Sequence, residues 1–429
     1  MPVHPARRAL LAVAVALTVG ALGACTEKLD SGAACPALCP GQTVPVRDTM
    51  LDAVVVDTSI LGYPAKGDES FLIVADRGSD LQASAVVRFD TLSTKYNKPL
   101  PDTGLAITEV HDSKVRLIVD SLGSRITAPI TLNVYDVNTT APDDDDAAVL
   151  ALFTSSRLIG SATFTAAQAK DTLFVPLSDS AVLNKVVNKQ RLRLGFRVIS
   201  SAPVQLKINS TAGGALAPQL SFDPTVTTDS VAALTMSPRS ATPVGLPTIA
   251  SSLRDYTIYT TGPRSLGGDA LSVGGLPARR TYLRFDVPQG LLDSTTIVRA
   301  VLLLTQRPNA SPDADTVIKI VPAAVLAGTD LTDIARSANV LAPDSAFGVT
   351  TIAYAPKDSG LRVIELGLLL RSWRTIAGRH PTQHAVVLRS GREGESAGEV
   401  RFFSTNAPAD TLRPRLRVTY VPRVDFGVP

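Results

Sequence analysis

Two histidines have the spacing that a metal site could use. His380 and His384 lie four residues apart, as two ligands on one face of a helix would. Pro381 interrupts such a helix, and no acidic third ligand lies near, so we expect no metal there. The sequence also contains no Gly-x-Ser-x-Gly, His-Glu-x-x-His or Walker-type motif. We therefore predict no catalytic residues and no cofactor.

Two acidic clusters could offer oxygen ligands to a cation. The run Asp143 to Asp146 and the pair Asp313 and Asp315 each follow a proline, in segments that we expect to be loops. Calcium binds such carboxylates, and weak sites fill at extracellular concentrations. A solvated run of charge is the commoner outcome, and we favour it.

Three cysteines remain to be explained, and two of them lie close together. Cys35 and Cys39 are four residues apart, with no histidine nearby to complete a zinc site. In an oxidising compartment we expect them to form a local disulfide.

The third cysteine ends a segment that has the order of an export signal. Arg7 and Arg8 form a basic head, and an apolar run too short to span a bilayer follows. Leu22-Gly23-Ala24-Cys25 resembles the bacterial lipobox, which implies cleavage after residue 24 and lipid on Cys25. Thr26, rather than Asp, follows the cysteine, which favours the outer membrane. We expect the chain to attach to the membrane of the cell envelope through this lipid.

Composition and charge limit the fold classes and the kinds of partner that we expect. Thr, Ser, Val, Asp and Pro are abundant, which favours many short strands and turns. The net charge is +3, far from a nucleic-acid-binding surface, and we expect no nucleic-acid partner. From residue 251 onward there are 21 Lys and Arg against 16 Asp and Glu, so the positive excess lies in the second half.

Two short motifs return after 196 residues. Val87-Arg88-Phe89-Asp90 matches Leu283-Arg284-Phe285-Asp286, and Pro218 to Phe222 matches Pro414 to Val418. Between them, alternating apolar residues indicate strands with one buried face. These residues are Val115, Leu117, Val119, Leu132 and Val134 in the first half, and Ala300, Leu302, Leu304, Ile318 and Ile320 in the second. Arg and Asp of the repeated motif share a face, where we expect an ion pair.

One short helix is expected in each half. Leu366, Leu369, Leu370 and Trp373 form an apolar stripe at helical spacing, and we expect Trp373 in the core. Leu183, Val186 and Val187 form a shorter stripe, with Ser178 or Asp179 as the cap. Each helix must lie against a sheet or close the end of a sandwich.

The second half resembles the DNRLRE domain of secreted and surface bacterial proteins, which is grouped with carbohydrate-binding modules. The matching segments are Tyr282 to Asp286, Ile297 to Leu304, the helix with Trp373 and Gly378, Val387 to Ser390, Phe403 to Asn406 and Arg413 to Leu416. The first half is a diverged copy that lacks the tryptophan and the Arg-Pro pair. The resemblance implies a jelly-roll-like β-sandwich for each half and, in some members, polysaccharide binding.

These observations predict an all-β protein of two tandem antiparallel jelly-roll-like sandwiches. The expected bounds are a signal peptide at 1–24, a lipidated tether at 25–47, a first sandwich at 48–224, a linker at 225–250 and a second sandwich at 251–429. A fragment from about residue 251 is then expected to fold alone.

A ligand site is expected in the second half. Arg279, Arg280 and Tyr282 enter the strand of the repeated motif, where two cations and an aromatic ring could be displayed for an acidic sugar. Three functions stay open. The chain is either a non-catalytic binding module for polysaccharide or another envelope protein, a polysaccharide-processing enzyme on a jelly roll, or a subunit of a surface assembly.

Overall fold

The computed structural model describes residues 45–52, 54–98, 104–225, 231–241, 253–261, 265–310, 313–325, 352–374 and 384–423. Several predictions lie outside these residues. They are the signal peptide, the lipidated Cys25, the pair Cys35 and Cys39, His380, and most of the expected tether and linker.

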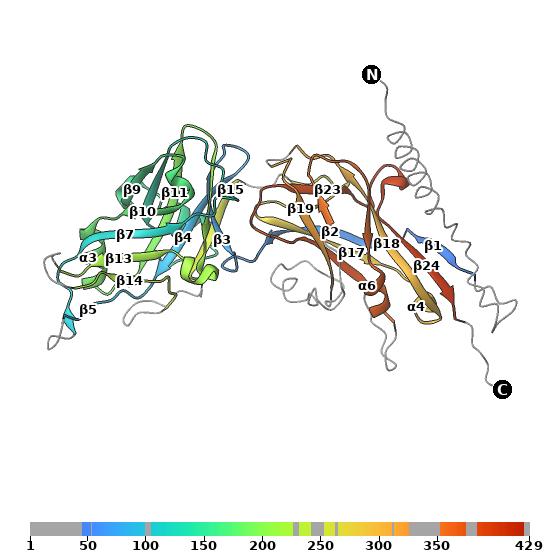
Figure 1. Cartoon of the computed structure of the whole chain (residues 1–429), viewed down its shortest axis with the longest axis horizontal. Coiled ribbons are helices and arrows are strands. Elements are labelled where there is room, and N and C mark those ends of the chain that lie inside the picture. The colour runs from blue at the N-terminus through green and yellow to red at the C-terminus, as the bar shows by residue number, and fades with distance from the viewer. Residues whose placement is uncertain are drawn as a thin grey trace, which may run out of the picture.

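In the described residues the chain is built of antiparallel strands with a few short helices. This confirms the all-β prediction. Figure 1 shows the strands gathered into two lobes that lie end to end along the long axis. We call the group formed by β3 to β15 lobe I, and the group formed by β1, β2 and β16 to β24 lobe II.

Lobe I consists of two sheets that pack around one hydrophobic core. The larger sheet has the order β12-β3-β4-β11-β8-β9 with β15 beside β4, and the smaller has the order β10-β7-β13-β14. Leu194 and Phe196 of the larger sheet meet Leu117 and Leu220 of the smaller in this core. The strands are β3 (Phe71–Asp76), β4 (Gln82–Phe89), β7 (His111–Ile118), β8 (Ile130–Asp136), β9 (Leu158–Phe164), β10 (Thr172–Pro176), β11 (Leu192–Ser200), β12 (Val204–Asn209), β13 (Gln219–Asp223), β14 (Leu234–Met236) and β15 (Asp255–Thr261), with a separate ribbon of β5 (Lys95–Tyr96) and β6 (Leu105–Ala106).

Lobe II is one continuously hydrogen-bonded sheet that encloses a second core. Its order is β1-β24-β18-β23-β16-β17-β22-β19-β20, with β2 beside β17 and β21 beside β18. Leu283, Leu302 and Phe402 belong to its core. The strands are β1 (Arg47–Leu51), β2 (Val54–Tyr63), β16 (Ala270–Gly274), β17 (Ala278–Phe285), β18 (Thr295–Arg307), β19 (Ile318–Ala324), β20 (Ile352–Tyr354), β21 (Gly360–Glu365), β22 (Ala385–Ser390), β23 (Glu399–Phe403) and β24 (Arg415–Pro422).

The alternating residues identified from the sequence form the buried faces of strands. All ten of them, from Val115 to Ile320, are buried, and each belongs to the core of its own lobe. The period of two therefore located β7, β8, β18 and β19 correctly.

Strand pairing crosses the expected domain bounds at four strands. β14, which lies in the expected linker, pairs with β13 of lobe I. β1 pairs with β24, and β2 pairs with β17 from Val54 opposite Phe285 to Tyr63 opposite Ala278. Both come from the expected first sandwich but complete lobe II. β15, from the expected second sandwich, pairs with β4 of lobe I. In the described residues the chain thus runs from lobe II to lobe I and back. The repeat in the sequence does not reveal this, because strand partners are set by non-local hydrogen bonds.

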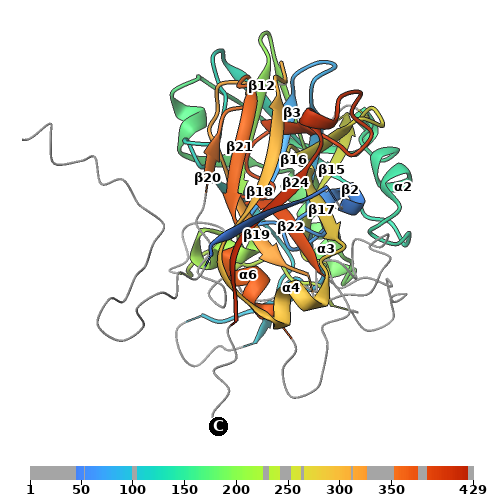
Figure 2. The same cartoon turned by 90° about the vertical axis from the view of Figure 1, so that its right-hand side faces the viewer.

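The described helices are short, and each lobe has more than the one expected. Lobe I has α2 (Asp146–Leu150) and α3 (Asp179–Val187), and lobe II has α4 (Gln289–Asp293) and α6 (Gly367–Ser372). The expectation of one helix per half is therefore wrong. Five-residue helices such as α2 and α4 are too short to show a periodic stripe. Figure 2, which looks onto lobe II, places α4 and α6 at the same end of its strands.

The stripe of α6 has the expected role, whereas that of α3 is only partly buried, because Val186 is buried but Val187 is exposed. Leu366, Leu369, Leu370 and Trp373 are all buried in the core of lobe II, so Trp373 is a core residue. Ser178 caps α3 by accepting a hydrogen bond from the Ala181 amide, 3.4 Å away. Among the residues that the structure describes, no helix combines the length and the apolar character needed to cross a membrane.

Candidate functional site

Arg279, Arg280 and Tyr282 lie on β17, but their side chains are buried rather than displayed. They are 5%, 7% and 2% exposed. Arg279 forms an ion pair with Glu399 at 2.6 Å, and the Tyr282 hydroxyl lies 2.9 Å from that of Tyr63. The expectation of an exposed cluster at a sheet end is wrong, because Arg279 pairs with Glu399 and Tyr282 packs among apolar side chains of β19 and β22.

Arg280 is also satisfied within the protein. Its Nε and Nη2 donate to the two carboxylate oxygens of Glu393 at 2.7 and 2.6 Å, and its guanidinium lies 3.9 Å from the Tyr63 ring centroid. This bidentate pair uses the geometry that was expected for a ligand carboxylate.

The first acidic cluster is largely structural. Asp143 is fully buried between Arg88 and Arg193, and Tyr256 donates a hydrogen bond to it at 3.3 Å. The Arg88 guanidinium also pairs with Asp90 at 2.5 Å, which confirms the same-face ion pair expected for this copy of the repeated motif. For Asp143 the expectation of a solvated charge is therefore wrong.

The rest of the run has separate local roles. The Asp145 side chain caps α2 by accepting from the Ala148 amide at 3.0 Å, and Asp146 forms an ion pair with Lys66. Asp144 is exposed. No group of three or more His, Cys, Asp and Glu side chains in the described part of the chain could hold a metal ion.

His384 packs against a core aromatic. Its ring stacks on Trp373 with 5.1 Å between centroids, and burial lowers the pKa of the imidazole.

The second acidic cluster leads to the junction between the lobes. Asp315 is exposed and pairs with Lys357 at 2.6 Å. Asp313 is buried and points the other way, toward lobe I, where its carboxylate pairs with Arg125 and lies 3.3 Å from Arg77. Its left-handed backbone (φ 70°) turns the chain so that its carbonyl accepts from the Thr316 amide at 2.8 Å.

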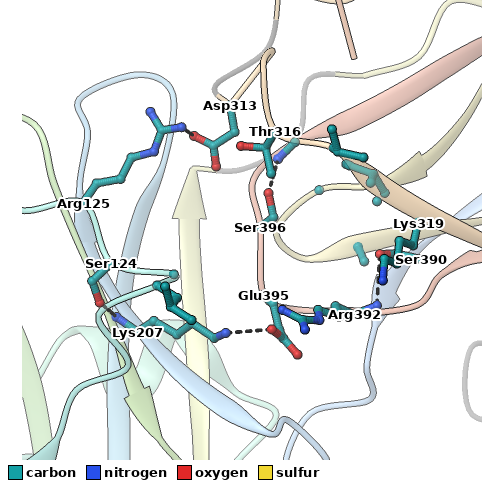
Figure 3. Close-up of a pocket in the computed structure, with 18 residues that line it drawn as sticks. Ser124, Arg125, Lys207, Asp313, Thr316, Lys319, Ser390, Arg392, Glu395 and Ser396 are labelled. Carbon is teal, nitrogen blue, oxygen red and sulfur yellow. Dashed lines mark hydrogen bonds and ion pairs between the residues drawn. The ribbon is translucent and has the colours of Figure 1, made fainter. Parts of the chain in front are cut away.

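A cavity of about 380 Å³ lies beside Asp313, between the lobes. This is within the range of pockets that hold small ligands, about 300–1,000 Å³. Its wall comes from five segments: the turn after β7, strand β12, the end of β16 with the turn that follows, the approach to β19, and the connection from β22 to β23. Figure 3 shows Arg125 and Lys207 entering from lobe I, opposite Lys319, Ser390 and Arg392 of lobe II.

Lys207 is the buried cation of this site. Its side chain is only 4% exposed, and its ammonium contacts Glu395 of lobe II at 2.7 Å and Asp120 of lobe I at 2.9 Å. The ammonium also lies 3.7 Å from the Phe71 ring centroid. Burial raises the pKa of Asp120, but the hydrogen bond from Lys207 and the charges of Lys207 and Arg392 outweigh it, so the pKa is lowered.

The two remaining cations of the cavity are differently placed. Lys319 and Arg392 are exposed, and neither side chain forms a hydrogen bond or an ion pair with another described residue. With Arg125 and Lys207 they make four cations against two carboxylates, Asp313 and Glu395, so the described residues of the lining have a net charge of +2. The cavity therefore favours a negatively charged occupant.

Small residues shape the lobe II side of the cavity. Gly274 adopts a φ of 96°, and a Cβ atom there would lie 2.7 Å from the Gly398 carbonyl oxygen. Glycine is thus required for β16 to approach β23 this closely. Hydroxyl groups of Ser124, Ser390 and Ser396 also line the wall.

The lobes are held together beside the cavity. Besides the ion pairs of Asp313 and Glu395, an apolar cluster joins Ile73 and Leu81 of lobe I to Leu276 of lobe II, with Ala397 packed against it. The cavity thus has walls from both lobes that are fixed to one another.

Sequence reasoning found only one residue of this site. Asp313 stood out as part of an acidic pair, but Lys207, Lys319 and Arg392 are isolated basic residues far apart in the chain. Only the meeting of the lobes brings them together.

Comparisons with known proteins give no family. No protein-family model matches the chain, and no curated protein matches it. Structures of infectious bursal disease virus are similar in part. The Gx strain structure is 9% identical over 88% of this chain and 76% of that chain, with a TM-score of 0.11. The VP2 subviral particle is 10% identical over 90% and 79%, with a TM-score of 0.10. These scores are too low to carry an argument about fold or function.

Proposed function

We propose that this chain is a non-catalytic binding lipoprotein of the bacterial cell envelope. Lipid on Cys25 anchors it, at the outer membrane, and two jelly-roll-like β-sandwich modules related to the DNRLRE domain carry the binding surface. The lipobox-like Leu22 to Cys25 supports the anchor, and the two separate cores support the two modules. The ligand class that we propose is a polysaccharide or another envelope component.

The junction cavity is the observation that carries the binding role. It offers exposed cations and hydroxyl groups on walls that come from both lobes, so a ligand there contacts both lobes. Such a pocket between structural units is a common place for ligands.

An enzyme on the same scaffold is the alternative. It would use the carboxylates in the cavity, Asp313 and Glu395, as acid and base. Both carboxylates are held in ion pairs, Asp313 with Arg125 and Glu395 with Lys207. A catalytic acid or base must be able to contact the substrate, so these pairs favour binding over catalysis.

The test uses the full-length protein in detergent. It is applied to an array of neutral and acidic polysaccharides, and the same polysaccharides are incubated with the protein and assayed for new chain ends. We expect retention of at least one polysaccharide without cleavage. New chain ends would favour the enzyme. Retention of none, with capture of an envelope protein instead, would favour a subunit of a surface assembly.

A further inference from the structure

The charge balance of the junction cavity is incomplete. Arg125 and Lys207 are neutralised by Asp313 and Glu395, as the contacts above show. Lys319 and Arg392 have no carboxylate within ion-pair distance in the described residues, although both line the same cavity. Figure 3 shows these two side chains on the lobe II wall, where the Arg392 amide donates to the Ser390 hydroxyl.

We infer that this cavity is a binding site for a small sugar that carries one carboxylate or phosphate group, and that Lys319 and Arg392 hold the anion. The inference rests on the proposed binding function and names the ligand chemistry of that site. An arginine can bind such a group through two parallel hydrogen bonds, while the lysine adds a point charge.

The other lining groups indicate that the ligand is rich in hydroxyls. The Ser390 and Ser396 hydroxyl oxygens accept from the Arg392 and Gly398 amides, at 3.3 and 3.1 Å, which leaves each hydroxyl hydrogen free to donate. Thr316 and the backbone of Gly275 also line the cavity. A volume of about 380 Å³ holds roughly a dozen water molecules, enough for one or two sugar rings.

The lining also separates this ligand from two other classes. None of the described residues that form the wall is aromatic, so neither a neutral sugar nor a nucleobase would find a ring among them to stack on. Recognition must then come from charge and hydrogen bonds. Because Lys319 and Arg392 are exposed, we expect the affinity to fall as salt is added.

The experiment is calorimetric titration of the full-length protein in detergent at low salt. Three pairs of probes are used: galacturonic acid and its dimer, glucose 6-phosphate and glucose, and inorganic phosphate and acetate. We expect binding of the acidic sugars, with glucose, phosphate and acetate at least tenfold weaker. Galacturonic acid carries a carboxylate and glucose 6-phosphate carries a phosphate, so their affinities show which of the two anions the site prefers.

The variants Lys319→Gln and Arg392→Gln test the two residues. Each removes one positive charge from the anion site, so we expect about a tenfold loss of affinity for each and about 100-fold for both. Arg417→Gln is the matched control, because Arg417 is an exposed cation of lobe II on β24, outside the cavity lining. Its affinity should equal that of the original protein. Thermal melts should be unchanged for all three.

Several results would overturn the inference. If inorganic phosphate binds as tightly as glucose 6-phosphate, the cavity does not recognise the sugar. If the double variant binds the acidic sugars as tightly as the original protein does, Lys319 and Arg392 do not form the site. Binding of no probe would exclude an acidic sugar as the ligand. If polysaccharide is still retained on the array in any of these cases, the proposed binding function stands and only this site is lost.

Discussion

Removing residues 1–264 deprives lobe II of β1 and β2, the strands that pair with β24 and β17. We therefore expect the fragment 265–429 to be unfolded, in contrast to the sequence-based expectation that a fragment from about residue 251 folds alone. β15 belongs to lobe I, so starting at residue 251 instead of 265 adds nothing to lobe II.

The size of the loss follows from the pairing. β2 is matched to β17 at eight residue positions. With about one hydrogen bond per position, at about 0.5–1.5 kcal/mol each, this is roughly 4–12 kcal/mol. Burial of the Val54 and Tyr63 side chains adds about 1.5–3 kcal/mol each. A domain has a total stability of only about 5–15 kcal/mol, so the fragment has little or none left.

The assay is complementation. Circular dichroism and thermal melting are recorded for the fragment 265–429 alone, with a synthetic peptide of residues 45–64, and with a peptide of the same composition in scrambled order. We expect a cooperative β-type melt only with the native peptide. A cooperative melt of the fragment alone, with a midpoint that the native peptide does not raise, would refute the reasoning.

Three further substitutions test the account of the interior. Asp143→Ala removes the carboxylate that pairs with the buried Arg193 and one of the two that pair with Arg88. Urea unfolding should therefore show a loss of about 3–5 kcal/mol, whereas the exposed Asp144→Ala should change stability by less than about 0.5 kcal/mol. Burial raises the pKa of Glu69 from 4.5 to about 7. As the pH rises, Glu69 therefore loses its proton at a lower pH in the unfolded chain than in the folded protein. The free energy of unfolding should fall by roughly 3 kcal/mol between pH 4.5 and 7. Glu69→Gln should remove that part of the slope, and an unchanged slope would exclude the assignment. Trp373→Ala should cost about 3–5 kcal/mol in the same unfolding assay, against little for the exposed Leu361→Ala; near-equal values would place Trp373 outside the core.

The local pattern of the sequence predicted much of the fold. Alternation at Leu117 and Leu302 identified strands because one face of each is buried, and the stripe ending at Trp373 identified a helix for the same reason. The ion pair of Arg88 with Asp90 followed from their shared face. Each of these features depends on residues within a few positions of one another.

Features that depend on distant segments were missed. Nothing near Val54 or Tyr63 indicates that β2 joins a strand more than 200 residues away, and this pairing helps to bury Arg280 and Tyr282. The junction cavity was missed for the same physical reason. Its charged groups are ordinary exposed-looking residues until both lobes are assembled.

The most direct test of the central claim combines the anchor with binding. Membranes from cells that make the protein are washed with high salt and incubated with a labelled acidic polysaccharide, and the label in the membrane pellet is measured. We predict that these membranes retain more label than membranes without the protein. We also predict that Cys25→Ser moves both the protein and the retained label to the soluble fraction. A pellet unchanged by Cys25→Ser would contradict the lipid anchor, and label no higher than in membranes without the protein would contradict the binding function.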